Sequence, residues 1–375
     1  MLIDLLLVLV GLVLLVLGGE ALVRGAGTLA AKAGISPLVI GLVVVSAATS
    51  APEFAVTIGA VLNGEPDLAV GNVVGSNIVN VLFILGVSAL FAPLIIKRQL
   101  VRFDIPVMLL MSVLLLMLSL DSKVDFTDGL ILISVLIAHT IISIFFGRRE
   151  QKSAEIPTES MPLNSKPVSM WLATLLLVAG VALLVLGAQA LVAGAVSIAT
   201  SLGVSSLVIG LTVVAIGTSL PELATAIVAI RKGETDMAVG NVVGSNIFNL
   251  GMVLGLPAML FGSGIPVAPS VLAIDLPLMI AAAVALLPIA FTGFIVARWE
   301  GLLFVTMYSS YTVYLVLAST EHDAISGFST VMVWFVLPLI AATLLAVTAY
   351  EIGIYRGKKL ASKRNLNSGE KTKGN

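Results

Sequence analysis

Long apolar segments constrain this chain more than any other feature does. About eleven of them follow one another, and each has roughly the 20 residues that a helix needs to cross a bilayer. They lie at 2–22, 37–62, 67–91, 104–120, 126–146, 170–193, 206–230, 236–261, 271–291, 299–318 and 329–350. Hydrophobic residues make up 59% of the chain and charged residues only 11%, which excludes a soluble enzyme. We therefore predict an all-α polytopic membrane protein.

The charges between the apolar segments predict an orientation. Cytoplasmic segments of membrane proteins are enriched in Lys and Arg. If the N-terminus is outside, all 20 Lys and Arg except Lys123 fall on the inside. The polar stretch 147–169 is then a cytoplasmic linker, and the basic stretch 356–375 is a cytoplasmic tail. The net charge of −1 gives no reason to expect nucleic acid as a partner.

The chain also contains an internal repeat. Residues 69–78 (AVGNVVGSNI) are identical to residues 238–247 at all ten positions. Weaker matches at a similar offset extend the repeat to 1–146 and 170–318, each with five apolar segments, and leave 319–355 as an extra helix. Because five is odd, the second repeat starts on the opposite side of the membrane from the first. Such inverted-topology repeats are typical of secondary transporters, whose site lies near the bilayer midplane.

Each repeat interrupts one apolar segment with the same kind of polar motif. Residues 48–53 read ATSAPE, and residues 217–222 read GTSLPE. A proline inside a helix removes one N–H donor and breaks the helix, and membranes tolerate such a break around a protein-lined cavity. Carboxylate, hydroxyl and carbonyl oxygens are ligands of hard cations such as Ca²⁺. The candidate ligands here are Thr49, Ser50, Glu53, Thr218, Ser219 and Glu222. A proline kink with only a structural role would be a reasonable explanation of one such motif, but it explains two matched copies less well than ion binding does.

The identical segments add a second polar element. Ser76 and Asn80 are four residues apart and share one face of a helix, as do Ser245 and Asn249. A polar stripe inside an apolar span faces protein or water rather than lipid, so we interpret both stripes as cation-coordinating walls. The Gly-xxx-Gly spacing in each copy predicts close packing against another helix.

With these two motif copies, the chain resembles the calcium:cation antiporter superfamily, in particular the prokaryotic sodium/calcium exchanger branch. The resemblance covers both five-span halves and rests on residues 41–80 and 210–249. It implies exchange of Ca²⁺ for Na⁺ by alternating access in a prokaryotic inner or plasma membrane, without enzymatic activity and without a cofactor. The ion ligands of the family map onto Thr49, Ser50, Glu53, Ser76, Asn80, Thr218, Ser219, Glu222, Ser245 and Asn249.

Departures from the family pattern leave two alternatives open. Many sodium/calcium exchangers carry Asp at the position of Asn249, so the maximum charge of this site falls to −2 and the Na⁺ count stays open. Ala48 also replaces the usual Gly of the first motif. The cation/proton branch has Glu-His after its Gly-Asn pair, whereas Val73 and Val74 follow here, which disfavours that branch. The first alternative is cation/H⁺ antiport by the same Glu pair. The second is a cation channel, which fits inverted repeats less well than a carrier does. K⁺ dependence also stays open.

Four further residues carry weaker expectations. Asp104 and Asp275 each precede an Ile-Pro or Leu-Pro pair near the start of a span, where we expect them to cap a helix N-terminus. Glu20 is expected to pair with Arg24 or with a broken helix, and His139 to make a hydrogen bond between packed helices. The first and sixth spans are rich in Gly, and we expect them to move as a gate.

Overall fold

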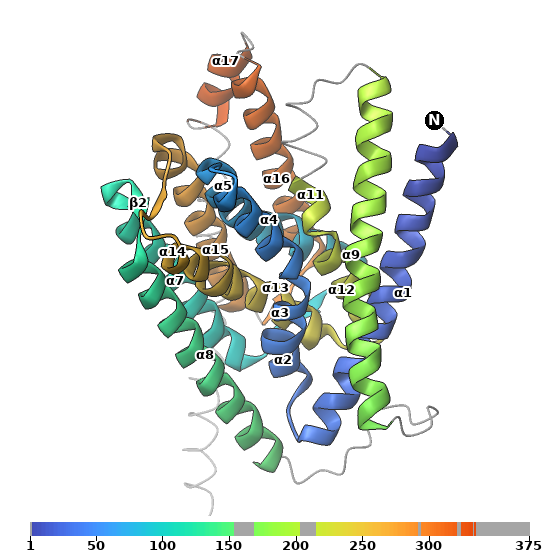
Figure 1. Ribbon diagram of the computed structural model, residues 1–375. Helices are drawn as coiled ribbons and strands as arrows, with labels where there is room; N and C mark the ends of the chain where they lie inside the picture. Colours follow the sequence, from blue (N-terminus) through green and yellow to red (C-terminus); the bar gives the residue numbers. More distant parts are fainter. Residues whose placement is uncertain are drawn as a thin grey trace, which may run out of the picture.

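The computed structural model describes residues 2–153, 169–202, 215–291, 294–320, 324–332 and 334, and these are almost entirely helical (Figure 1). The first half contains α1 (Leu2–Ala33), α2 (Pro37–Ile40), α3 (Ser46–Thr49), α4 (Ala51–Leu62), α5 (Pro66–Ile78), α6 (Leu85–Phe91), α7 (Ile105–Leu118) and α8 (Phe126–Ser153). The second half contains α9 (Met170–Ser201), α11 (Ala215–Thr218), α12 (Leu220–Arg231), α13 (Thr235–Phe248), α14 (Gly255–Leu260), α15 (Leu276–Phe291), α16 (Arg298–Ser319) and α17 (Ala324–Val331).

Several spans contain wider, π-helical turns. These are η1 (Gly41–Val45), η2 (Val79–Ile84), η3 (Leu100–Asp104), η6 (Asn249–Leu254) and η7 (Val271–Asp275), and a short 3₁₀ turn, η4 (Ser119–Asp121), follows α7. Each π-turn joins directly to an α-helix, so a span such as α5–η2–α6 is continuous over residues 66–91. π-Helical turns are rare in proteins and are frequent at functional sites.

Seven described helices are long and apolar enough to cross a membrane, and the bent pair α2–α3 and α4 adds an eighth if it forms one span. The predicted span at 271–291 corresponds to a shorter apolar helix, Val271–Leu287. The predicted spans at 206–230 and 329–350 lie partly outside the described residues. The coarse prediction of a helical, multi-pass membrane fold is therefore confirmed for the described part of the chain.

Three helices extend well beyond the predicted spans. α1 continues to Ala33, beyond the predicted end at 22, and α9 continues to Ser201, beyond the predicted end at 193. α8 continues to Ser153, seven residues into the predicted linker. The residues that follow the apolar part of α8 include Arg, Glu, Gln and Lys, which are good helix formers. The helix therefore continues beyond the predicted membrane span. The rest of that linker, 154–168, lies outside the described residues, as does the predicted tail at 356–375.

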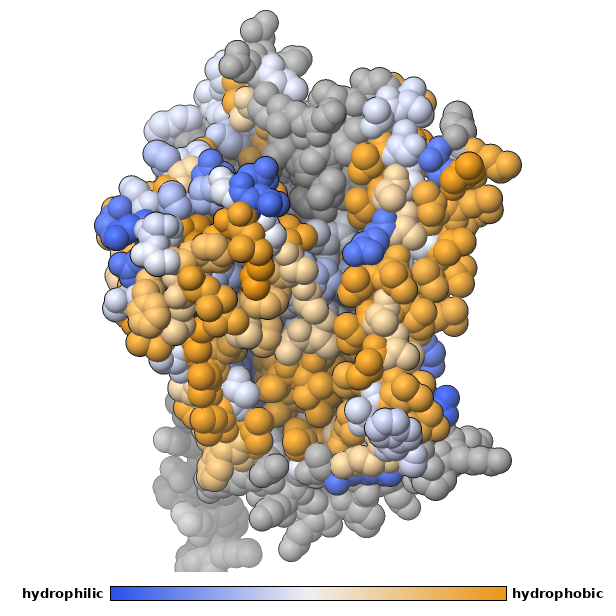
Figure 2. Space-filling model, viewed as in Figure 1, coloured by the Kyte–Doolittle hydropathy of each residue, from blue (hydrophilic) through white to orange (hydrophobic). Residues whose placement is uncertain are grey.

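The surface of the bundle is apolar along its length. Hydrophobic side chains cover most of the face shown in Figure 2, including the outer surfaces of α1 and α9. Leu9 on α1 and Val178 on α9 are each 58% exposed. An exposed apolar surface this extensive is unfavourable in water and suits contact with lipid.

The helices α1 and α9 lie side by side and run antiparallel (Figure 1). Gly11 contacts the backbone of α9 near Leu191, and Gly25 contacts it near Leu177. Because glycine has no side chain, the two backbones approach closely along their whole length. The pair packs against the rest of the bundle through contacts of both helices with α12.

Two short antiparallel strand pairs connect the halves. β1 (Leu94–Ile95) pairs with β4 (Ile295–Val296), and β2 (Lys123–Val124) pairs with β3 (Ile265–Pro266). In both pairs, one strand comes from each half of the chain.

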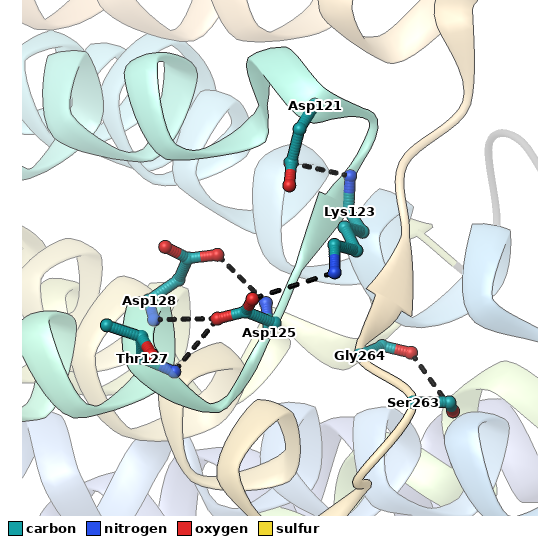
Figure 3. A network of polar contacts seen from close by, with 7 residues as sticks. All are labelled: Asp121, Lys123, Asp125, Thr127, Asp128, Ser263 and Gly264. Atoms are coloured by element: carbon teal, nitrogen blue, oxygen red, sulfur yellow. Dashed lines mark hydrogen bonds and ion pairs between the residues drawn. The ribbon is translucent and has the colours of Figure 1, made fainter.

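The turn beside β2 holds the acidic residues that flank Lys123 (Figure 3). Asp125 Oδ1 accepts a hydrogen bond from the backbone N–H of Thr127 at 2.9 Å, and Asp128 Oδ2 accepts one from the N–H of Asp125 at 2.9 Å. The backbone N–H of Asp128 is the main cause that lowers the pKa of the Asp125 carboxyl below its ordinary value. These acids therefore cap the start of α8.

Candidate ion site

Both proline motifs break their helices as predicted. Ser50 separates α3 from α4 with φ −77° and ψ 4°, and Ser219 separates α11 from α12 with φ −92° and ψ 8°. The first break bends the helix pair by 42°. Pro52 and Pro221 each sit in the first two positions of the helix that follows, where the missing N–H costs no helical hydrogen bond.

The two predicted acids lie just beyond these breaks, in the core of the bundle. Glu53 and Glu222 occupy the first turns of α4 and α12, and each is 1% exposed. They lie close together, because Ser219, three residues before Glu222, contacts the carboxylate of Glu53. Among the described residues, no Lys, Arg or His forms an ion pair with either acid. Two buried carboxyl groups therefore lie together without a basic partner among the described residues.

Hydroxyl groups connect each break to the other half of the chain. Ser219 Oγ donates a hydrogen bond to Glu53 Oε1 at 3.3 Å. Thr49 Oγ1 lies 3.4 Å from Ser245 Oγ and donates to Asn241 Oδ1 at 3.2 Å. The two motif pairs, which are far apart in the sequence, thus form one buried polar cluster.

The two asparagines that end the polar stripes use their amides in the same way. Asn80 Nδ2 donates to Asn246 Oδ1 at 3.0 Å, and Asn249 Nδ2 donates to Asn77 Oδ1 at 3.4 Å and to Ser76 Oγ at 3.3 Å. Each amide nitrogen thus has an acceptor, whereas the oxygens of Asn80 and Asn249 have no donor among the described residues. Both oxygens are therefore available to a cation.

Several oxygens of the cluster lack hydrogen-bond donors. The buried side-chain oxygens without a partner in the described chain include Ser50 Oγ, Glu53 Oε2, Asn80 Oδ1, Glu222 Oε1, Glu222 Oε2 and Asn249 Oδ1. Thr49 faces the carboxylate of Glu222 without a close hydrogen bond. A buried acceptor left unsatisfied costs about 1–3 kcal/mol, and more if it is charged. Such oxygens are the ligands of hard cations.

Nine of the ten predicted ligands are at most 4% exposed. The exception is Thr218, which is partly exposed and lines a cavity described below. The sequence prediction missed Asn77 and Asn246, which hold the amides of Asn249 and Asn80. Their position inside the ten-residue identical segment was the available signal, because a repeated polar residue within an apolar span requires a partner.

The helix-capping prediction for the two aspartates is wrong. Asp104 and Asp275 lie at the ends of η3 and η7 within continuous helix, so the N–H groups that follow them already have helical acceptors. Asp104 Oδ1 instead lies 2.8 Å from His139 Nε2, which confirms the predicted packing hydrogen bond of that histidine. Asp275 Oδ1 accepts a hydrogen bond from the Tyr311 hydroxyl at 2.8 Å.

The expectation for Glu20 is met in part. Its carboxylate forms an ion pair with Lys232 at the end of α12, which belongs to a broken span, and not with Arg24 on its own helix. A contact between segments so far apart in sequence depends on how α1 packs against α12, which local sequence does not determine.

Known proteins resemble this chain over most of its length. The family described as sodium/calcium exchanger protein matches residues 3–145 and 172–317. The chain is 38% identical to the inner membrane protein YrbG of Escherichia coli over 271 residues, covering 69% of this chain and 81% of YrbG. It is 33% identical to the sodium/calcium exchanger MaX1 of Methanosarcina acetivorans over 346 residues, covering 84% and 98%. A structure of the sodium-calcium exchanger NCX_Mj, soaked with 10 mM Na⁺, superposes with a TM-score of 0.70 at 30% identity and covers 82% of this chain and 97% of NCX_Mj.

Proposed function

The chain belongs to the sodium/calcium exchanger protein family, and from that membership we propose that it is a secondary antiporter that exchanges Ca²⁺ for Na⁺ by alternating access. The observation that carries the proposal is the buried pair Glu53 and Glu222, which share one polar cluster and lack a basic partner in the described chain. Cations from solution are the natural counter-ions of such a pair.

The proposed site consists of the ten predicted ligands. Two oxygen-rich breaks supply hydroxyls and carboxylates, and two polar stripes supply hydroxyls and amide oxygens. The ligands are Thr49, Ser50, Glu53, Ser76, Asn80, Thr218, Ser219, Glu222, Ser245 and Asn249. Unsatisfied oxygens on both acids and both asparagines support this assignment. Asn77 and Asn246 would orient the two asparagine ligands.

The charge of the pair explains why transport would be coupled. One Ca²⁺ neutralises two carboxylates, and so do two Na⁺. Closing the site around an uncompensated charge is costly, because each buried ion loses several kcal/mol of solvation. Only a loaded site would therefore cross between the two faces, so that one ion leaves as the other enters.

We further propose that residues 1–146 and 170–318 form two inverted five-helix repeats, with the N-terminus outside and an eleventh helix within 319–355. The antiparallel arrangement of α1 and α9, which start the two repeats, supports the inversion. The same two helices pack on each other along their length. This packing would let them move together as the gate.

The deciding experiment is Ca²⁺ uptake into proteoliposomes that contain the purified protein. An outward Na⁺ gradient should drive uptake, whereas a pH gradient of equal energy should not. Uptake driven by the pH gradient alone would instead assign the Glu pair to cation/H⁺ antiport. Currents far above carrier turnover rates in planar bilayers would identify a channel.

A further inference from the structure

A cavity connects one face of the bundle with the wall of the ion site. It has a volume of about 340 Å³, and α5, α16, Thr218 and Asp275 line it. Along α5 and into η2 its lining runs from Asp67, at the exposed start of α5, to Val79. Twelve residues of helix span about 18 Å, which is more than half of the hydrocarbon thickness of a bilayer. In the orientation proposed above, Asp67 lies at the outer face, so the cavity opens outward.

The deep end of the cavity meets residues of the ion site. Asn72 lines the cavity and donates a hydrogen bond to the backbone carbonyl of Glu53 at 3.0 Å. Thr218 also lines it and directly precedes Ser219, which donates to Glu53 Oε1 at 3.3 Å. An ion that moves along this cavity would therefore arrive beside the buried acids.

Asp275 is the acid on the wall of this route. Its carboxylate is partly exposed and accepts one hydrogen bond, from the Tyr311 hydroxyl. The described lining of the cavity contains no Lys, Arg or His, and no described basic side chain pairs with Asp275. An uncompensated carboxylate in a cavity with low-dielectric walls concentrates cations there.

The equivalent aspartate of the first half is sealed. Asp104 precedes an Ile-Pro pair as Asp275 precedes a Leu-Pro pair, yet it is 0% exposed. His139 and Ser143 contact its Oδ1 at 2.8 and 3.1 Å. The cavity beside it, of about 250 Å³, is lined mostly by apolar side chains and includes His139 but not Asp104. One aspartate of the matched pair is therefore open to an ion route, and the other is closed off.

We propose that Asp275 is a second, weaker cation-binding position, which holds Ca²⁺ or Na⁺ on its way between the outer face and the buried acids. This inference rests on the proposed function for the identity of the ions. The Tyr311 hydroxyl orients the carboxylate and leaves its other oxygen for the cation. A single carboxylate in contact with water binds Ca²⁺ more loosely than the protein sites that surround the ion with six to eight oxygens, which suits an ion in transit.

Terbium luminescence tests the position directly, because Tb³⁺ replaces Ca²⁺ at oxygen sites and is excited by a nearby tyrosine such as Tyr311. The Glu53→Gln/Glu222→Gln double variant removes the charge of the buried site and leaves Asp275 in place. We expect this variant to retain tyrosine-sensitised luminescence that a large excess of Ca²⁺ displaces. Adding Asp275→Asn should remove this signal, whereas Asp275→Glu should keep it. The matched control is Asp121→Asn, an acid on the same face outside the cavity, which should leave the signal unchanged.

A transport assay supplies the second measurement. At sub-saturating outer Ca²⁺, Asp275→Asn should slow exchange roughly tenfold, the lower end of what electrostatic focusing in a cleft provides. An impermeant salt should slow the wild type by screening and affect Asp275→Asn less. Equal luminescence in the variants with and without Asp275→Asn, or an unchanged exchange rate, would overturn the inference. A wild type that shows the luminescence but exchanges no Ca²⁺ for Na⁺ would instead contradict the proposed function.

Discussion

The same ten-residue sequence occupies two different environments in this molecule. In α13, residues 238–247 are buried from end to end. A methyl group added at Gly240 would lie 2.8 Å from the carbonyl oxygen of Leu38, and one at Gly244 would overlap the carbonyl oxygen of Leu42. The segment α2–η1 of the first half therefore covers the glycine face of this copy.

The other copy is open on the corresponding face. In α5, residues 69–78 leave Gly71 exposed, and no described atom lies within 4 Å of a methyl group built on Gly71 or Gly75. This face lines the 340 Å³ cavity. Identical sequences thus produce identical helices and polar stripes, whereas packing of the opposite half decides which copy faces a route for ions. An alternating-access carrier held in one state is expected to show this difference.

The largest expected effect concerns Glu53 and Glu222, which are equally buried in the two halves. Glu53→Gln and Glu222→Gln should each reduce Na⁺-driven Ca²⁺ uptake roughly a hundredfold or more, because losing one partner of a buried charged set costs about 3–5 kcal/mol. Gln keeps the shape of Glu, so both variants should fold, as elution from a sizing column would verify. Near wild-type exchange by either variant would show that the site lies elsewhere.

The second prediction tests the two environments themselves. Gly244→Ala should destabilise the protein by about 2 kcal/mol, because its methyl group must push the Leu42 backbone away. Gly75→Ala should leave stability unchanged or raise it by up to about 1 kcal/mol, since alanine favours a helix where space is open. Thermal unfolding of both variants in detergent measures the difference. Equal melting temperatures would mean that the two copies are packed alike.

Local chemistry explains what the sequence could predict. Pro52 and Pro221 cannot continue a helix, so the breaks at Ser50 and Ser219 follow from the sequence alone. The polar stripes follow in the same way, because polar side chains in a span must face protein. Repetition of the motifs then predicted which polar residues share a site.

Contacts between distant segments were beyond that reasoning. His139 was expected to bond to another helix, but nothing local indicated Asp104 as its partner, and Asp104 was mistaken for a helix cap. The π-turn η3 decides that outcome, because it continues the helix through the aspartate. The difference between the open and the covered glycine face could not be predicted either, since the two copies are identical in sequence.

The third prediction adds a charge to one half of the site. Asn249→Asp places a carboxylate against Asn77 Oδ1, which now accepts a hydrogen bond from the Asn249 amide. The extra charge favours Ca²⁺ over Na⁺, and we expect the affinity for Ca²⁺ to change about tenfold or less. We also expect an altered voltage response, since one charge moved across the membrane is worth about 2.3 kcal/mol per 100 mV. Na⁺-driven Ca²⁺ flux at clamped potentials measures both. The control Asn63→Asp adds the same charge on an exposed turn. Identical behaviour of the two variants would show that position 249 does not belong to the ion site.

The smallest effect concerns an ion pair between the halves that has no counterpart at the repeat-equivalent positions. Glu20 of α1 pairs with Lys232, whereas the repeat-equivalent positions carry the uncharged Gln189 and Asn63. The Glu20 side chain is 56% exposed, so solvent screens the pair, and Glu20→Gln should cost less than about 1 kcal/mol of stability. High salt should shrink the difference between wild type and variant, because exposed charges are screened within about 10 Å at 0.1 M salt. Melting temperatures at low and high salt, with Gln189→Glu as the control in the other half, provide the measurement. A loss that persists in high salt would mean that Glu20 holds α1 against α12 by packing rather than by charge.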